Sequence, residues 1–212
     1  MVDEKDKPCT VKGESTCTSC MLPDKIHCRW SHKVLNGFYA IGFPAFLGTL
    51  ILLVMLNFIT GQWWPIVLYI LLVIIIFGYE IKFLCSHCPY YAGDEKSLKC
   101  LGNKGAPKIY QYNPGPMNGI EKNLMKMLIA LFYGTIPVLV AIVTLFLVFT
   151  GPYDLISKTG AMGMVIMTLG ECWSFLVIMK VFYCSMCINF SCPLNTVEKR
   201  IVDVPDEESC HA

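Results

Sequence analysis

Four long runs of apolar residues dominate the chain. Three contain no charged residue, Val34 to Gln62, Trp63 to Tyr79 and Met127 to Tyr153, and the fourth, Thr159 to Val181, contains only two. About 20 apolar residues, each rising 1.5 Å, cover a hydrocarbon core of roughly 30 Å. The pattern therefore predicts four transmembrane helices, at about 35–60, 63–84, 124–150 and 160–183.

The distribution of basic residues predicts the orientation of these helices. Of the 17 Lys and Arg residues, 16 lie before the first helix, in or beside the central loop, or at and beyond the inner end of the fourth helix. Only Lys158 falls on the other side. Because basic residues concentrate in cytoplasmic segments, we expect a multi-pass membrane protein with a cytoplasmic N-terminus, C-terminus and central loop.

Composition supports a membrane protein over a soluble one. Of the 212 residues, 55% are hydrophobic and 16% are charged, against about 45–50% and about 25% in soluble domains. The net charge of +1 gives no support to nucleic-acid binding. We predict an all-α fold, a four-helix transmembrane bundle with five segments: an N-terminal tail (1–33), a first transmembrane hairpin (34–84), a central loop (85–122), a second hairpin (123–183) and a C-terminal tail (184–212).

Matching features suggest that the two hairpins are repeats. An aromatic pair followed by a proline occurs at Phe38-Tyr39 and again at Phe132-Tyr133, and Thr-Gly ends the first helix of each pair. The second helix of each pair ends in Cys-Ser-x-Cys, at Cys85 and at Cys184. Chance recurrence in apolar helices is the alternative explanation. Because four features recur in the same order, we favour an internal duplication, with copies related by an axis along the membrane normal.

The chain contains 12 cysteines, and the predicted topology places all except Cys172 on the cytoplasmic side. Thiols in that compartment are kept reduced, so structural disulfides are disfavoured. Clustered reduced thiols are typical of metal ligands or redox centres. Palmitoylation is an alternative for the cysteines next to the helices.

The candidate metal ligands form two groups. One group lies in the N-terminal tail, at Cys9, Cys17, Cys20 and Cys28. The other lies beside the membrane, at Cys85, Cys88, Cys100, Cys184, Cys187 and Cys192, with His87 as a further candidate. Four converging thiolates suit both zinc and an iron–sulfur cluster. The Cys-Pro pairs at Cys88 and Cys192 favour iron–sulfur slightly, although the tight four-cysteine run of bacterial ferredoxins is absent.

Glu171 and Cys172 are candidate functional residues inside the fourth helix. An ionisable side chain at that depth costs several kcal/mol unless it is neutral, paired or hydrated. Both residues lie within one arc of the helix with Met164, Met179 and Met186, which would form a stripe of soft ligands. The alternative is that the methionines fill gaps in helix packing.

These observations lead to one main functional hypothesis and two alternatives. The main hypothesis is a membrane protein with a cytoplasmic cysteine-ligated metal centre, acting in redox or electron transfer, with the lipid bilayer, a redox protein or quinone, and a second copy of the chain as candidate partners. The first alternative is a transporter or efflux module for a soft metal ion, using the Glu171–Cys172 stripe. The second is a membrane thiol–disulfide oxidoreductase.

Overall fold

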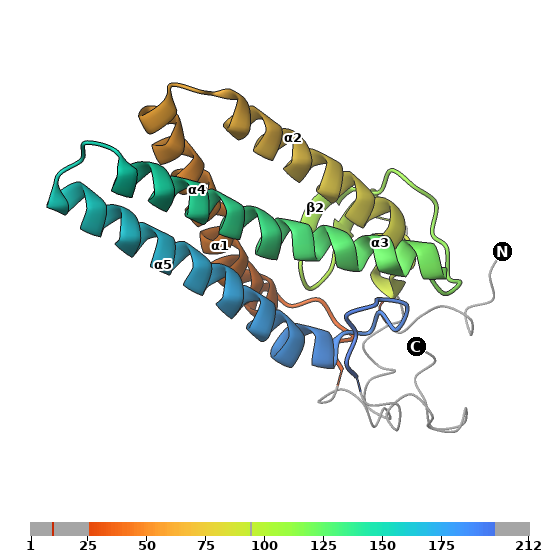
Figure 1. Cartoon of the computed structure of the whole chain (residues 1–212). Helices are drawn as coiled ribbons and strands as arrows, with labels where there is room; N and C mark the ends of the chain where they lie inside the picture. Colours follow the sequence, from red (N-terminus) through yellow and green to blue (C-terminus); the bar gives the residue numbers. More distant parts are fainter. Residues whose placement is uncertain (1–9, 11–25, 94, 198–212) are drawn as a thin grey trace, which may run out of the picture. The chain divides into compact units, whose positions relative to one another are not determined.

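The computed structural model describes residues 10, 26–93 and 95–197 (Figure 1). Cys9, Cys17 and Cys20, expected to be ligands in the N-terminal tail, lie outside these residues, as does Cys210. The described α-helices are α1 (His32–Thr60), α2 (Trp64–Tyr79), α3 (Gly119–Ala130), α4 (Ile136–Thr150) and α5 (Leu155–Ile178). Turns of π-helix continue α2 as η3 (Glu80–Cys85), join α3 to α4 as η5 (Leu131–Thr135), and continue α5 as η6 (Met179–Tyr183).

Four continuous helical stretches are long and apolar enough to cross a membrane. They are His32–Thr60, Trp64–Cys85, Gly119–Thr150 and Leu155–Met186, and they confirm the prediction of four such helices. The third and fourth begin about five residues earlier than the apolar pattern predicts. The reason is polar capping: Asn118 precedes the third stretch, and the carboxylate of Asp154 accepts the backbone N–H of Ser157 at the start of the fourth.

The chain divides into two compact units, which we name by their content. The helical unit comprises residues 39–78 and 127–177 and contains most of the four helices. The cysteine unit comprises the described residues of 1–38, 79–126 and 178–212. Of the described cysteines, only Cys172 belongs to the helical unit.

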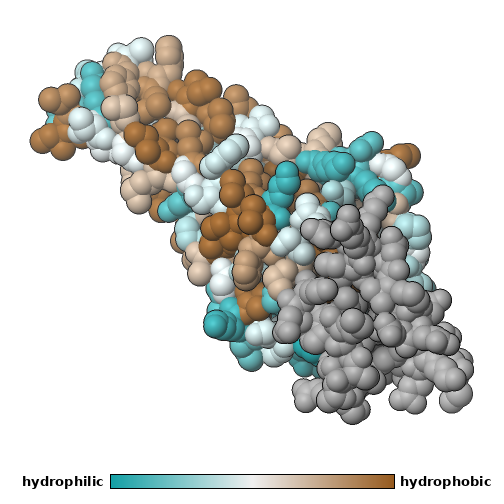
Figure 2. Space-filling model, turned by 90° about the horizontal axis from the view of Figure 1, so that it is seen from below, coloured by the Kyte–Doolittle hydropathy of each residue, from teal (hydrophilic) through white to brown (hydrophobic). Residues whose placement is uncertain are grey.

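The helical unit presents apolar side chains on its outside. Phe58 is 79% exposed, and Phe146, Ile74 and Ile166 are all more than 60% exposed, so every helix contributes. Figure 2 shows hydrophobic residues spread over the helical surface. An exterior of this kind is unfavourable in water and suits a lipid environment.

Inside the helical unit, the helices pack through a buried aliphatic cluster and a stack of aromatic rings. Leu52 of α1, Ala141 of α4 and Val165 of α5 form one buried cluster. The ring of Tyr69 from α2 stacks between Phe46 and Phe132, with centroid distances of 5.8 and 5.5 Å. These contacts fix α1 against the other three helices.

At one end of the helical unit, the last threonine of α1 and the last threonine of α4 make the same side-chain bond, while the glycines that follow differ in conformation, with φ +69° at Gly61 and φ −79° at Gly151 (Figure 1). The hydroxyl of Thr60 donates to the carbonyl of Leu56 at 2.8 Å, and that of Thr150 donates to the carbonyl of Phe146 at 2.7 Å. The following residue is glycine in both cases. Gly61 has φ +69°, a conformation that a residue with a Cβ adopts only with strain.

The cysteine unit is built from short elements around two small cores. Strands β1 (Ser97–Lys99) and β2 (Lys104–Pro107) pair antiparallel and form a hairpin. Ile81, Tyr91, Leu98 and Ala106 form one core, and Ile26, Tyr90, Leu101 and Ile188 form the other. The short 3₁₀ turns η4 (Pro89–Tyr91) and η7 (Cys184–Met186) lie within this unit.

Helix α3 begins with a reciprocal cap whose removal provides a test of the fold. Asn118 accepts the backbone N–H of Glu121 at 2.8 Å, and the Glu121 carboxylate accepts the N–H of Asn118 at 2.8 Å. We expect Asn118→Ala to lower the free energy of unfolding by about 1 kcal/mol, because it leaves a helix N–H without its partner. The measurement is thermal unfolding in detergent. Asn123→Ala, at an exposed position inside the same helix, is the control and should cause no loss; an equal loss in both variants would contradict the role of the cap.

Candidate functional site

Both Cys-Ser-x-Cys motifs sit in the same local backbone structure. Each follows a turn of π-helix, Glu80–Cys85 in one case and Met179–Tyr183 in the other. The last cysteine of each motif is extended, with φ −86° and ψ 134° at Cys88 and φ −84° and ψ 128° at Cys187. The helix therefore stops within the motif, and the second cysteine turns into the cysteine unit.

Serine side chains support these helix ends. The hydroxyl of Ser185 donates to the carbonyl of Val181 at 2.6 Å, and the hydroxyl of Ser86 donates to the carbonyl of Lys82. Each bond spans four residues and satisfies a carbonyl in the last helical turn. The serine in Cys-Ser-x-Cys thus has a structural role at both positions.

Cysteines from distant parts of the chain pack around one core. The side chains of Cys28, Cys88, Cys100 and Cys187 all lie against the cluster of Ile26, Tyr90, Leu101 and Ile188. Cys85, Cys184 and Cys192 are free thiols of the same unit. The structure thus brings together the described cysteines that the sequence assigned to the group beside the membrane.

Cys28 joins this group through backbone contacts of its neighbour His27. The N–H of His27 donates to the carbonyl of Met186 at 2.8 Å, forming an isolated parallel bridge with Cys187. The hydroxyl of Tyr90 donates to the carbonyl of His27 at 2.7 Å. Cys28, which its spacing grouped with the tail cysteines, therefore lies with Cys187 and Cys88.

Backbone N–H groups point at the sulfur atoms of four cysteines. The amide of Tyr90 bonds to Cys88, and the amide of Asn189 bonds to Cys187 at 3.5 Å. The backbone amides of Gly102 and Asn103 lower the pKa of Cys100, and those of Leu194 and Asn195 lower the pKa of Cys192; the Asn195 N–H also donates to the carbonyl of Cys192 at 3.1 Å. An N–H aimed at sulfur stabilises a thiolate more than a thiol, because the bond is assisted by the negative charge.

The amide two residues on acts at all four of these cysteines. Cys88 and Cys192 are followed by proline, which has no N–H, so the first amide available to either sulfur is two residues on. The same offset occurs at Cys100 and Cys187, where leucine and isoleucine follow the cysteine, so the arrangement does not depend on proline.

Burial opposes the ionisation of these thiols. It raises the pKa of Cys88 well above its usual value, and the nearby thiols of Cys187 and Cys100 raise that pKa further. Burial likewise raises the pKa of Cys187 to about 12, and raises the pKa of Cys100 and of Cys192. At neutral pH the thiols are neutral, and a positive charge among them is needed to hold several as thiolates.

The side chains do not form a finished metal site as they stand. Among the described residues, no group of three or more His, Cys, Asp or Glu side chains is arranged to hold a metal ion. The predicted four-thiolate set is therefore gathered in one unit without meeting around one point.

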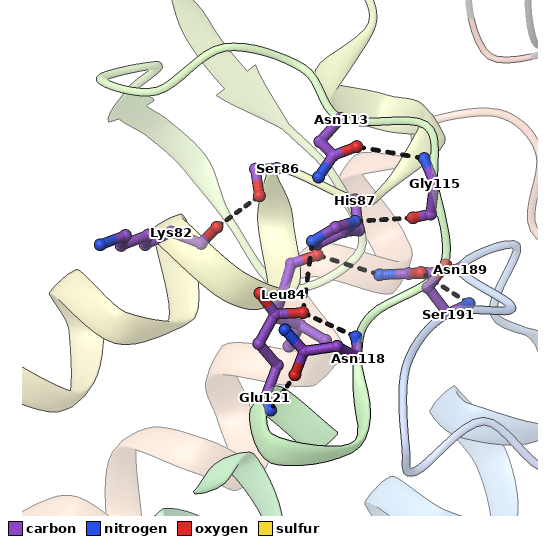
Figure 3. A network of polar contacts seen from close by, with 10 residues as sticks. All are labelled: Lys82, Leu84, Ser86, His87, Asn113, Gly115, Asn118, Glu121, Asn189 and Ser191. Carbon is purple, nitrogen blue, oxygen red and sulfur yellow. Dashed lines mark hydrogen bonds and ion pairs between the residues drawn. The ribbon is translucent and has the colours of Figure 1, made fainter.

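His87 is engaged in a polar network (Figure 3). Its Nδ1 lies 2.7 Å from the carbonyl of Gly115 and so donates to it, and its Nε2 lies 3.8 Å from the carboxylate of Glu121. Both ring nitrogens face protein partners, which disfavours His87 as a ligand. The ring instead links the first cysteine motif to the N-terminus of α3.

Asn189 makes a second link that the sequence did not reveal. Its side-chain amide donates to the carbonyl of Leu84 at 3.1 Å, just before the first motif (Figure 3). Its own backbone N–H bonds to the Cys187 sulfur. One residue thus ties the second cysteine motif to the helix end that carries the first.

The two candidate residues of the fourth transmembrane stretch lie in the helical unit. The thiol of Cys172 is buried and donates to the carbonyl of Ala45 at 3.7 Å, with the hydroxyl of Thr49 4.0 Å from the sulfur. The carboxylate of Glu171 lies against Gly48. Cys172 therefore has partners that explain its burial without a metal ion.

Comparison with protein-family models, with curated proteins and with solved structures finds no match to this chain.

The raised thiol pKa values predict a loss of stability in alkali. Because the pKa of Cys187 rises from its ordinary value of 9.0 to about 12 on folding, the folded state holds the proton that the unfolded state releases. Stability contributed by the neutral thiol is complete below pH 9 and is lost as the pH rises toward 12, by up to about 1.4 kcal/mol per pH unit for one group.

The measurement is thermal unfolding of the reduced, chelator-treated protein at pH 7.5 and pH 10.5. We expect Cys187→Ser, which cannot ionise in this range, to lose less stability between the two pH values than the unaltered protein. Equal losses would show that the Cys187 thiol does not resist ionisation.

Proposed function

We propose that this chain is an integral membrane protein that carries a thiolate-ligated metal centre beside the membrane and acts in redox or electron transfer. The observation that carries the proposal is the set of backbone amides aimed at the sulfurs of Cys88, Cys100, Cys187 and Cys192. Such donors around a metal-bound thiolate orient the ligand and tune the metal. These four cysteines are the proposed ligands.

The amides favour metal binding over simple packing of thiols. A buried free cysteine that only fills space behaves as a small hydrophobe with a weak S–H donor. It has no need of N–H groups, whose benefit is greatest when the sulfur is negatively charged. Four sulfurs have such donors although burial disfavours their ionised form. This combination supports a bound cation that offsets the negative charge.

Ligand binding requires movement of the side chains. As no three of them form a ligand group as they stand, the thiols must rotate toward the ion. The backbone around them is already placed by the His27–Met186 bridge and by the Asn189–Leu84 bond. Rotation about χ1 is inexpensive compared with moving these segments.

An iron–sulfur cluster is the proposed occupant, with zinc as the alternative. Both accept four thiolates, and only the cluster supplies redox chemistry. The other seven cysteines beside the membrane or in the tails, Cys9, Cys17, Cys20, Cys28, Cys85, Cys184 and Cys210, are then available for a second centre or for support of the first.

We further infer that the chain contains two copies of a helical hairpin and that the cysteine unit is cytoplasmic. Support for the duplication comes from the paired local structures: the Thr-Gly ends of α1 and α4, and the π-turn, serine bond and extended cysteine of both motifs. Support for the orientation comes from the 16 of 17 basic residues that it places inside.

The metal centre is tested by composition and spectrum of the protein purified without oxygen. We expect stoichiometric iron with sulfide and a visible charge-transfer band; zinc without the band would support a structural centre in place of the redox one. The double variant Cys88→Ser/Cys187→Ser should lose most of the bound metal, a decrease of tenfold or more.

Cys172→Ser provides the matched control, because it removes a buried cysteine from the other unit. It should keep the full metal content. Absence of stoichiometric metal from the unaltered protein, or retention of it by the double variant, would contradict the proposal.

The orientation is tested with a membrane-impermeant maleimide on intact cells. Gln62→Cys places a thiol between α1 and α2, and we expect it to be labelled from outside. Lys104→Cys, in the cysteine unit, should be labelled only after lysis. Labelling of Lys104→Cys on intact cells would reverse the proposed topology.

A further inference from the structure

The side chain of Glu171 lies against α1 at Gly48, where the absence of a Cβ leaves room for the carboxylate. A Cβ at Gly48 of α1 would lie 2.9 Å from Oε2 of Glu171 and 3.0 Å from the hydroxyl oxygen of Thr168. Both oxygens therefore share the small space that the glycine leaves. The hydroxyl is placed beside the carboxyl group, within one patch of the α1–α5 contact.

Within the helical unit, no cationic side chain lies near Glu171. The helical unit contains only three charged residues, Asp154, Lys158 and Glu171. The two lysines on the same continuous helix, Lys158 and Lys180, lie thirteen and nine positions away, which is about 20 Å and about 14 Å along the axis. An ionisable side chain without a partner in hydrocarbon costs several kcal/mol, which makes Glu171 a candidate functional residue.

The other titratable side chains around this patch supply no positive charge either. Cys172 of α5 donates its thiol to the carbonyl of Ala45, and Tyr69 of α2 donates its hydroxyl to the carbonyl of Phe46 at 3.4 Å. Helix α4 carries no titratable residue. Glu171 is therefore the carboxyl group of this patch, and no cationic side chain of the helical unit lies beside it.

Two buried oxygens further along the helices lack partners. Oδ1 of Asn57 and the hydroxyl oxygen of Thr144 have no hydrogen-bond partner, and the two residues are 4% and 0% exposed. A buried polar atom left in this state costs about 1–3 kcal/mol, so both positions favour a hydrogen-bonding ligand. Water is the ligand that suits an amide oxygen and a hydroxyl group together.

These oxygens and Glu171 lie on opposite sides of one apolar layer. Leu52, Ala141 and Val165 form that layer. Asn57 is five residues beyond Leu52 toward the Thr60 end, and Thr144 is three residues beyond Ala141 toward the Thr150 end. On α5, which runs in the opposite direction, Thr168 and Glu171 follow Val165 on the other side.

We propose that Glu171 is a proton-binding site inside the helical unit, reached from the Thr60 and Thr150 ends by water at Asn57 and Thr144. The carboxylate accepts a proton from water and becomes a neutral acid that bonds to Thr168, and the reverse step returns the proton. The apolar layer of Leu52, Ala141 and Val165 limits the rate of this exchange. This proton site belongs to the helical unit and does not depend on the metal centre proposed for the cysteine unit.

Infrared spectroscopy of the full chain in lipid bilayers tests the site. The unaltered protein should show the carbonyl stretch of a protonated carboxylic acid at neutral pH, and Glu171→Gln should lack it. Transfer to D₂O should shift the band as the proton exchanges. Absence of a band that depends on Glu171 would overturn the proposal.

The route is tested by the rate of that exchange. We expect Asn57→Leu and Thr144→Val to slow exchange of the Glu171 band by at least severalfold, because they remove the polar positions on the access side. Ser174→Ala, at an exposed position on α5, should leave the rate unchanged. Unchanged exchange rates in both access variants would overturn the route. Both variants retain Glu171, so they test the route even if Glu171→Gln folds poorly.

Discussion

The exclusion of apolar surface from water is the constraint on which the rest of this structure depends. Helices with Phe58, Phe146 and Ile166 on their outside expose apolar surface that is unfavourable in water and suits a lipid environment. Lipid in turn accepts almost no polar side chain without a partner. Most charged residues consequently belong to the cysteine unit or to the tails. Polar residues of the helical unit such as Cys172 and Tyr69 have hydrogen-bond partners on the neighbouring helix α1.

The cysteine unit depends on local backbone structure more than on a large core. A π-turn, a serine bonded to the preceding helical turn and an extended second cysteine recur at Cys88 and Cys187. Short bonds from His27, Tyr90 and Asn189 then bring three segments together. In this setting the amide groups at the sulfurs are the most informative feature, because they favour charge on atoms that burial keeps neutral.

The two units set different conditions for ionisable groups. In the cysteine unit, thiols are close to one another and to backbone donors, which suits a shared cation. In the helical unit, Glu171 lies beside Thr168 and Gly48, and that unit contains no other charged residues than Asp154 and Lys158. The two proposals, a metal centre in the cysteine unit and a proton site in the helical unit, concern different groups and can be tested separately.

The sequence by itself predicted the four helices that are long and apolar enough to cross a membrane, because apolar runs of sufficient length leave few other options. It also predicted the two cysteine motifs and singled out Glu171. It placed the starts of the third and fourth helices late, since caps at Asn118 and Asp154 lie outside the apolar pattern. Spacing alone grouped Cys28 with the tail, whereas a backbone bridge between His27 and Cys187 decides its position.

Only the tertiary structure could reveal the contacts that give these residues their chemical setting. The role of Gly48 depends on which helix packs against it, and the isolation of Asn57 and Thr144 depends on what their neighbours leave unpaired. The amides at Cys88 and Cys192 follow from local chain direction, and their proximity to Cys100 and Cys187 follows from folding. Hydropathy and residue spacing can be read from neighbouring positions in the sequence. Coordination, burial and hydrogen bonding depend on contacts between residues that are distant in the sequence.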